Sequence, residues 1–267
     1  GKTTFIRIIN QITMPDTGSV LLDGKALQPD DIRYIGYLPE ERGLYKSMKV
    51  GEQVLYLAQL KGLSKQEAKR RLKYWFDRFE IGDWWNKKIQ ELSKGMAQKI
   101  QFIVTVLHQP KLLIFDEPFS GFDPINASLI KDEILKLRDD GATVIFSTHR
   151  MESVEEMCDH IALIHKSNKI LDGKLIDIKR AYKSNTFEVG LLTENKIEVG
   201  KAIQEKFEVF PASFKSINDE LQYKIKIPVN SSPNDLVGYL TSKGQLNHFV
   251  EVVPTANDIF IETVQNN

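Results

Sequence analysis

Cysteine is nearly absent from this sequence of 267 residues, in which Cys158 is the single thiol. One thiol cannot form an internal disulfide bond, so the chain is not a small disulfide-stapled scaffold. This usage is consistent with a reducing, cytoplasmic compartment. Because Cys158 lies in a segment with helical spacing, residues 151–159, we expect a buried and unreactive thiol.

Long apolar runs are also missing from the sequence. The most apolar stretches, residues 102–107 and 112–115, are far shorter than the roughly 20 residues that a membrane-spanning helix needs. The first residues lack the charged and then apolar pattern of an export signal. We therefore expect a chain that neither spans a membrane nor is exported. Its hydrophobic content of 42% is sufficient for one large or two modest domains.

An excess of charge of one sign is missing as well, because 36 basic residues balance 36 acidic ones. Most nucleic-acid-binding proteins carry a basic surface, so we expect no nucleic-acid partner. Nine basic and four acidic residues nevertheless lie between positions 61 and 88. Such a run is typical of a solvated helix face, and it could also form an approach surface for another protein or a lipid head group.

Strand and helix patterns alternate through the first two thirds of the sequence. Asp23-Gly24 is typical of a tight hairpin turn, and later apolar runs predict buried parallel strands separated by helices. This alternation predicts an α/β fold with a parallel sheet covered by helices. The expected strands are residues 18–23, 34–38, 112–115, 143–146 and 161–164, and the expected helices begin near residue 5 and span residues 50–60, 65–79, 125–137 and 151–159.

The pattern changes after a polar stretch at residues 180–185, which suggests a domain boundary. Beyond it, 11 acidic and eight basic residues again argue against nucleic-acid binding. Alternating apolar residues and helical spacing predict a separate, small α+β domain over residues 183–267. Its expected strands are residues 187–192, 223–227 and 249–253, and its expected helices are residues 197–207 and 234–244.

The sequence opens on Gly1-Lys2-Thr3-Thr4, directly before an apolar-periodic segment. Gly-Lys-Thr at the start of a helix is typical of the second half of a phosphate-binding loop. In that loop, backbone N–H groups hold phosphates, the lysine reaches the β- and γ-phosphates, and the threonine hydroxyl binds Mg²⁺. An ordinary capped helix start would give the same four residues. We expect the first half of the loop to precede residue 1, and the sequence as given to bind ATP poorly.

Two carboxylates, Asp116 and Glu117, end the apolar run at residues 112–115. Because ligands of open parallel sheets bind beyond the carboxyl ends of the strands, Asp116 could hold Mg²⁺ there and Glu117 could polarise an attacking water. Adjacent acids before a proline could instead simply end a strand. The Gly-Lys-Thr at the start of the sequence favours the nucleotide-binding interpretation.

Five ordered motifs together resemble the ATP-binding subunits of ABC transporters. They are Gly1 to Thr4, Leu92-Ser93-Lys94-Gly95-Met96, the strand ending Asp116-Glu117-Pro118, Ser120-Gly121-Phe122-Asp123-Pro124, and Ser147-Thr148-His149. The resemblance covers residues 1–177. It implies a P-loop NTPase core over residues 1–180 with an inserted helical subdomain at about 48–108. It also implies a head-to-tail homodimer or pseudo-dimer in which ATP and Mg²⁺ lie between the phosphate loop of one chain and the Leu-Ser-Lys-Gly-Met segment of the other.

The resemblance also implies a role for each matching residue. Lys2 would neutralise phosphate oxygens, Glu117 would be the general base, and His149 would contact the γ-phosphate, although a lone histidine is often purely structural. The implied ATP-binding residues are Gly1, Lys2, Thr3, Thr4, Ser93, Gly95, Ser120 and Asp123, and the implied Mg²⁺ ligands are Thr3, Asp116 and Glu40.

Three positions depart from the family pattern. Lys94 stands where the family usually has glycine, Met96 where it has glutamine, and Glu40 where it has the glutamine that touches Mg²⁺ and water. A carboxylate at position 40 can still bind Mg²⁺, but it cannot donate a hydrogen bond. The segment Leu-Pro-Glu40-Glu41-Arg42-Gly-Leu-Tyr and the C-terminal residues 256–261 resemble a bacterial branch associated with sodium or drug efflux.

The resemblance implies an ATP-hydrolysing subunit of a bacterial export system. Such a subunit lies on the inner face of the cell membrane, bound to an integral-membrane permease. The basic helices and Trp84 and Trp85 could dock that permease, although the two tryptophans are more simply explained as packing residues. A non-hydrolysing regulatory module and a soluble ATPase without a transport role are the alternatives.

Overall fold

The computed structural model describes residues 1–40, 43–217 and 219–266, so Glu41 and Arg42 of the efflux-type motif lie outside the described residues. The chain divides into two compact units. The first comprises Gly1–Ser153 with Ile164–Asn168, and the second comprises Val154–Leu163 with Lys169–Asn267. No described helix is long and apolar enough to cross a membrane.

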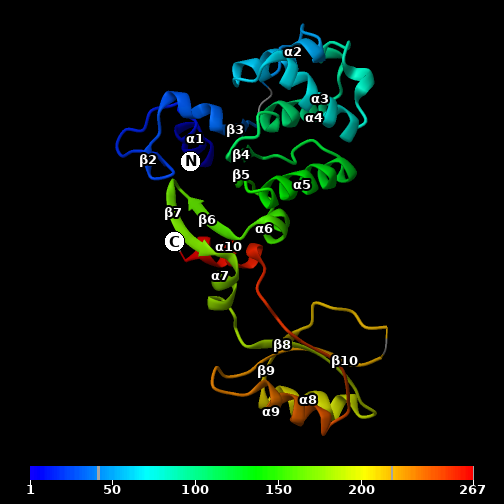
Figure 1. The fold of residues 1–267 in the computed structure, drawn as a ribbon. Helices are drawn as coiled ribbons and strands as arrows, with labels where there is room; N and C mark the ends of the chain where they lie inside the picture. Colours follow the sequence, from blue (N-terminus) through cyan, green and yellow to red (C-terminus); the bar gives the residue numbers. More distant parts are fainter. Residues whose placement is uncertain (41–42, 218, 267) are drawn as a thin grey trace. The chain divides into compact units, whose positions relative to one another are not determined.

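A three-stranded parallel sheet forms the centre of the first unit (Figure 1). Its order is β3 (Ile35–Leu38), β4 (Leu112–Asp116), β5 (Thr143–Ser147). All five residues of β4 are buried, as expected for an apolar strand between two neighbours. The register pairs Leu38 with Phe115 and Asp116 with Ser147, so the carboxyl ends of the three strands meet at one edge. The predicted α/β class is confirmed.

The first helix and a small hairpin precede this sheet. Helix α1 (Lys2–Ile9) buries Ile6 in a cluster with residues of β3 and β4. Strands β1 (Leu21–Leu22) and β2 (Lys25–Ala26) pair across Asp23 and Gly24, whose φ angles of 50° and 76° form the predicted tight turn. A 3₁₀ helix, η1 (Pro29–Tyr34), then leads into β3.

Helices occupy the segment between β3 and β4. Trp75, Phe79 and Phe102 pack their rings within 6.0 Å of one another between centroids, which gives this segment an aromatic core. The elements are α2 (Val50–Leu60), α3 (Lys65–Arg78), η2 (Gly82–Trp84), η3 (Ile89–Glu91) and α4 (Lys94–Val106), and α5 (Pro124–Asp139) follows β4.

One predicted strand pairs differently from the expectation. The run at residues 161–164 was expected in the parallel sheet, but β6 (His160–His165) pairs with β7 (Asn168–Lys174) in a separate two-stranded sheet. The connection is short, and Lys166 and Ser167 adopt φ angles of 44° and 66°. These left-handed conformations make a tight hairpin turn, which the apolar pattern of the strand alone could not predict.

The second unit contains a four-stranded antiparallel sheet in the order β11, β8, β10, β9. Helices and strands alternate as βαββαβ, the ferredoxin-like arrangement. Alternate residues such as Val189, Leu191 and Ile225 pack with Ile203 of α8 and Leu236 of α9. The elements are α7 (Leu175–Ala181), β8 (Thr186–Leu192), α8 (Lys196–Lys206), β9 (Glu208–Pro211), β10 (Leu221–Lys226), α9 (Pro233–Thr241), β11 (Gln245–Glu251) and α10 (Ala256–Gln265).

The last helix packs near α7 and the short helix α6 (Met151–Met157). Tyr182, which follows α7, shares a hydrogen bond of 2.9 Å with Thr263 of α10. Glu155 of α6 pairs with Lys179 of α7 and also accepts a hydrogen bond from the Ala256 N–H at the start of α10. Glu155 therefore ties α7 and α10 together within the second unit.

Candidate functional site

The carboxyl ends of β4 and β5 bring Asp116 and Ser147 together. The Ser147 hydroxyl donates to Oδ1 of Asp116, a side chain that is only 3% exposed. The other carboxylate oxygen, Oδ2, is buried and has no hydrogen-bond partner among the described residues. A buried, unpaired carboxylate oxygen is costly without a ligand, and oxygen ligands are those that Mg²⁺ prefers. Asp116 thus fits its predicted role as a Mg²⁺ ligand.

The chain turns sharply at Glu117, the residue that directly follows β4. Its φ is +49°, a left-handed conformation that costs a non-glycine residue energy and that recurs at functional sites. Its N–H donates to the Ser147 carbonyl at 2.9 Å, which fixes the turn against β5. The side chain is 11% exposed and accepts hydrogen bonds from the Thr148 hydroxyl at 3.3 Å and the His149 N–H at 2.9 Å.

His149 also contacts Glu117 through its ring. Its Nδ1 lies 2.8 Å from Oε1 of Glu117, while 77% of the histidine side chain is exposed. The predicted switch histidine and the predicted general base therefore form one hydrogen-bonded pair. This geometry favours a functional histidine over an isolated structural one.

Lys2, from the start of the chain, reaches the same edge of the sheet. Its Nζ donates to the Thr148 carbonyl at 3.1 Å. Gly1 is the N-cap of α1, and Thr3 and Thr4 are exposed in its first turn. The positive end of a helix dipole therefore lies beside the lysine, which is the arrangement that binds phosphates.

Glu40 follows β3, whose carboxyl end adjoins that of β4. It is exposed in a bend after Pro39, and the Pro39 carbonyl accepts a hydrogen bond from Gln101 of α4 at 3.5 Å. Glu40 thus leaves the sheet at the same edge as Asp116, but the structure brings the two side chains into no described contact. Its role toward Mg²⁺ stays a prediction.

The remaining predicted residues form a second group at the start of α4. Ser93 caps this helix by accepting from the Met96 N–H at 3.2 Å. Asp123 caps α5 by accepting from the N–H groups of Ile125 and Asn126 at 3.1 and 3.0 Å. A further hydrogen bond from the Asn126 side chain is the main reason why the pKa of Asp123 is lowered. The Ser120 N–H donates to the Glu117 backbone carbonyl at 3.1 Å, but no described hydrogen bond or ion pair joins this group to the side-chain carboxylates of Asp116 or Glu117.

Ser147 and Thr148 orient the two carboxylates, a role that their motif did not predict. Their polar side chains directly after the strand at residues 143–146 were the available signal. Burial, followed by the negative charge of Asp116, raises the pKa of Tyr37 on the neighbouring strand, and the positive charge of Arg7 opposes this shift.

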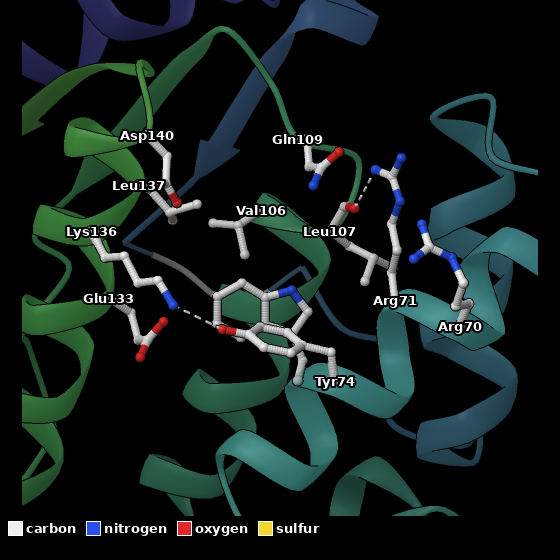
Figure 2. Close-up of a pocket in the computed structure, with 11 residues that line it drawn as sticks. Arg70, Arg71, Tyr74, Val106, Leu107, Gln109, Glu133, Lys136, Leu137 and Asp140 are labelled. Atoms are coloured by element: carbon white, nitrogen blue, oxygen red, sulfur yellow. Dashed lines mark hydrogen bonds between the residues drawn. The ribbon is translucent and has the colours of Figure 1, made fainter.

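A separate cavity of about 320 Å³ lies between α3, the end of α4, and α5 (Figure 2). Trp75, Leu107 and Leu137 give it apolar walls, and Lys136 donates to the Tyr74 hydroxyl at 3.2 Å. Arg70 and Arg71 line its other side.

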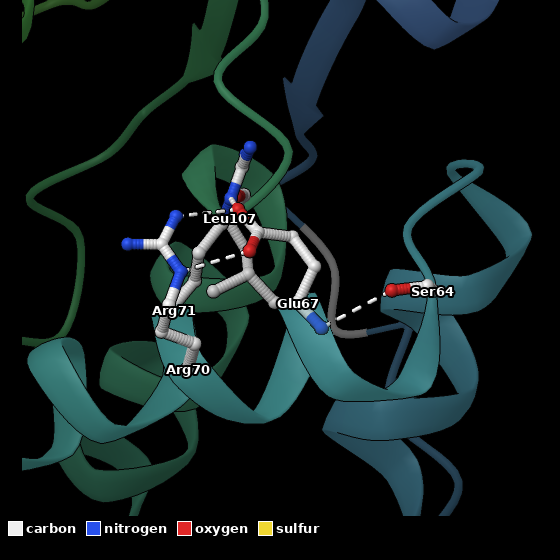
Figure 3. A network of polar contacts seen from close by, with 5 residues as sticks. All are labelled: Ser64, Glu67, Arg70, Arg71 and Leu107. Carbon is white, nitrogen blue, oxygen red and sulfur yellow. Dashed lines mark hydrogen bonds and ion pairs between the residues drawn. The ribbon is translucent and has the colours of Figure 1, made fainter.

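Both arginines donate hydrogen bonds to the carboxylate of Glu67 (Figure 3). The hydrogen bond from Arg70 is the main reason why the pKa of Glu67 falls to about 2. Arg71 donates to Oε1 of Glu67 at 2.6 Å and to the Leu107 carbonyl at 3.0 Å, which ties α3 to the end of α4. The cavity therefore has a braced rim of mixed charge, because Glu133 and Asp140 line it together with Arg70, Arg71 and Lys136.

Comparison with known proteins identifies the two parts of the chain. Residues 1–120 match the ABC transporter family, and residues 173–264 match the family described as ATP-binding protein DrrA1-3-like, C-terminal domain. The uncharacterized ABC transporter ATP-binding protein YhaQ of Bacillus subtilis is 40% identical over 264 residues, covering 99% of this chain and 86% of YhaQ. The ABC transporter ATP-binding protein NatA of the same organism is 34% identical, covering 69% of this chain and 76% of NatA.

Two solved structures have similar folds. An ATP-binding subunit of an ABC transporter gives a TM-score of 0.64 at 31% identity, covering 68% of this chain and 77% of that one. CbiO1 of Clostridium perfringens, part of the cbiONQ complex, gives 0.56 at 26% identity, covering 68% and 78%. The motifs, the parallel sheet with its paired carboxylates and these likenesses agree, and the chain belongs to the ABC transporter ATP-binding proteins.

Proposed function

We propose that this chain hydrolyses ATP as the nucleotide-binding subunit of a bacterial export system. One observation carries the proposal. Lys2, Asp116, Glu117 and His149 gather at the carboxyl edge of the parallel sheet, although they come from three distant parts of the sequence. Such an edge is where open α/β sheets bind ligands.

The residues at this edge suit phosphoryl transfer to water, with ATP as the substrate. Lys2, at the start of α1, would bind the β- and γ-phosphates together with the N–H groups of that helix. Asp116 would hold Mg²⁺, with Thr3 and Glu40 as the further predicted ligands, and the bound ion would neutralise charge on the phosphate oxygens.

Glu117 would orient the attacking water and accept its proton. Its hydrogen bonds from Thr148 and His149 fix the carboxylate, while 11% exposure keeps it accessible to water. His149, which is held by Glu117 and largely exposed, would reach toward the γ-phosphate. Catalysis would therefore depend on positioning and charge stabilisation rather than on a covalent intermediate.

The active site would be shared between two chains. Ser93, Gly95, Ser120 and Asp123 make no described hydrogen bond to the side-chain carboxylates of Asp116 and Glu117, although the Ser120 N–H donates to the Glu117 carbonyl. This lack of contact with the carboxylates supports a head-to-tail dimer in which the signature group of one chain completes the site of the other.

A membrane permease would be the second partner. The likeness to NatA and the DrrA1-3-like C-terminal domain support an export role, in sodium, drug or similar efflux. The cavity between α3 and α5 offers a permease segment apolar walls and a rim that includes Arg70, Arg71 and Lys136. The chain would then lie on the inner face of the membrane through that contact.

Replacing Glu117 with glutamine tests the proposal. The amide keeps the shape of the side chain but cannot accept the proton of water, so we expect kcat for ATP hydrolysis to fall at least about a hundredfold. Because ATP would still bind, Glu117→Gln should form a stable dimer with ATP and Mg²⁺. Steady-state kinetics and analytical ultracentrifugation measure both effects.

Wild-type protein with ADP is the control, since it should stay monomeric. Hydrolysis by the wild type that is unchanged in Glu117→Gln would disprove the role of Glu117. A Glu117→Gln protein that stays monomeric with saturating ATP would contradict the shared site.

A further inference from the structure

The side chain of Lys94 lies against Gly121, in the loop that precedes α5. A Cβ atom placed on Gly121 would come within 2.9 Å of the Lys94 Cδ and 2.8 Å of its Nζ. Gly121 also has a φ of +84°, so a side chain there would be strained as well as obstructed. The aliphatic stem of Lys94 therefore fills the space beside the glycine.

Two further contacts join the same two segments. The Gln98 amide nitrogen donates to the carbonyl of Ser120, the residue before Gly121. A Cβ placed on Gly95 would lie 3.9 Å from the ring of Phe122, the residue after it. The start of α4 thus contacts three successive residues of the loop. Because residues 94 and 98 are one helical turn apart, they lie on the same face of α4.

The contact of Lys94 is one of packing and not of charge. Its ammonium group has no hydrogen bond or ion pair among the described residues, and the residue is exposed. A long side chain that lays its methylene groups on a backbone while its charge stays in water restrains that backbone without an ion pair. Glycine, which the family pattern has at this position, would leave the loop unsupported on this side.

We propose that Lys94 is a positioning residue that clamps the loop 120–123 onto the signature segment, so that Ser93 and Ser120 keep a fixed separation. This inference rests on the proposed function, in which both segments face the nucleotide held by the other chain. A mobile loop would close the shared site less often in a productive geometry. Lys94 would thus raise kcat without contributing to the binding of ATP at Lys2.

Two substitutions separate the methylene stem from the charge. Lys94→Met keeps an unbranched side chain without charge, and Lys94→Gly removes the side chain. Lys65 provides the matched control, because it is the first residue of α3 behind Ser64, as Lys94 is the first residue of α4 behind Ser93. Lys65→Gly should therefore reproduce any general cost of glycine at the start of a helix.

The clamp is measured first without nucleotide. Hydrogen exchange of the Ser120 and Phe122 amides, which donate to Glu117 and Phe119, reports the opening of the loop. We expect Lys94→Gly to speed this exchange at least about threefold, and Lys94→Met and Lys65→Gly to match the wild type. Unchanged exchange in Lys94→Gly would overturn the clamp, whatever the activity of the protein.

Kinetics then test the consequence for the reaction. Lys94→Gly should lower kcat about tenfold while KM and the affinity for a fluorescent ATP analogue stay unchanged, and Lys94→Met should restore kcat to within twofold of the wild type. A low kcat in both Lys94→Gly and Lys94→Met, together with loop amides that exchange as slowly as in the wild type, would overturn the role of the methylene stem. Such a result would assign the effect on kcat to the ammonium charge. A wild type that neither hydrolyses ATP nor dimerises refutes the proposed function instead, while the exchange result still decides the clamp.

Discussion

Asp116 and Glu117 are adjacent in the sequence but have different surroundings. Asp116 is enclosed at the end of β4 with one oxygen unpaired, whereas Glu117 is held by Thr148 and His149 near the surface. The apolar run before them predicted that both would stand at the sheet edge. The left-handed φ of Glu117 could not be predicted, because it depends on the hydrogen bond that its N–H makes to Ser147 of another strand.

His108 illustrates a residue whose surroundings the sequence does not reveal. Its Nε2 lies 3.3 Å from the Ile35 carbonyl, and its Nδ1 is buried without a partner among the described residues. Burial, followed by the charge of Lys61, lowers the pKa of His108 to about 4, and the hydrogen bond to Ile35 only partly opposes this. The native protein therefore holds this histidine neutral.

Stability should consequently fall as the solution becomes acidic. Between pH 6.5 and 4 the unfolded chain binds a proton at His108 that the folded chain does not, so the free energy of unfolding decreases with falling pH. This group would remove at most about 2 kcal/mol between pH 7 and pH 5. Urea unfolding at both pH values measures the loss.

His108→Gln is the control, since it cannot titrate. It should lose less stability than the wild type over the same pH interval. An equal loss in both proteins would show that other groups cause the pH dependence.

At the scale of elements, long periodic segments were predicted closely. The expected helix at residues 50–60 is α2, and the tight turn at Asp23-Gly24 joins β1 and β2. Short edge strands were missed, since the four residues of β9 carry too little pattern to be distinguished from a loop. The helix α10 was also missed, although Thr255 and Asp258 form a capping box at its start.

The contacts of Trp85 support its interpretation as a packing residue. Its indole ring packs edge-on against Phe76 at 5.5 Å between centroids, and it also covers Gly51 of α2. A Cβ on Gly51 would come within 2.6 Å of the indole Cδ2 and Nε1 atoms. The aromatic ring and the glycine therefore fit together as a pair.

Gly51→Ala should destabilise the protein by about 1–3 kcal/mol. Overpacking against the indole outweighs the roughly 1 kcal/mol by which alanine favours a helix over glycine. Gly238 of α9 is the matched control, because nothing lies within 4 Å of its Cβ position. Gly238→Ala should raise the midpoint of thermal unfolding while Gly51→Ala lowers it, and a rise in both would refute the packing argument.

At the scale of the molecule, the family, the fold class and the positions of Asp116 and Glu117 at the sheet edge followed from ordered motifs. The sequence could not reveal that Lys94 packs on Gly121, because this contact joins two segments that are about 26 residues apart. Nor could it reveal the cavity between α3 and α5, whose walls come from three helices. Motifs predict which residues meet a nucleotide, whereas packing decides what holds them in place.

The cavity leads to a prediction for the assembled system. Arg70→Glu combined with Lys136→Glu would reverse charge on its rim, so binding to membranes that contain the cognate permease should weaken about tenfold. ATP hydrolysis by the isolated chain should stay unchanged, since both residues line the cavity, whose lining includes neither Asp116 nor Glu117. Cosedimentation with permease-containing vesicles measures the binding.

Lys201→Glu on the exposed surface of α8 is the control, and it should bind such vesicles as the wild type does. Equal binding by the rim variant and the wild type would place the permease contact elsewhere.

The chain enters and leaves the ferredoxin-like sheet at one point. Lys183 pairs with Glu251 at 2.6 Å, the Val252 N–H donates to the Thr186 carbonyl at 2.8 Å, and Tyr182 meets Thr263. The two ends of the segment 184–252 therefore lie next to each other. A short linker could replace this cassette, or a related cassette could be inserted, while α7 and α10 remain in contact. A lineage could in this way exchange the accessory sheet without rebuilding the rest of its unit.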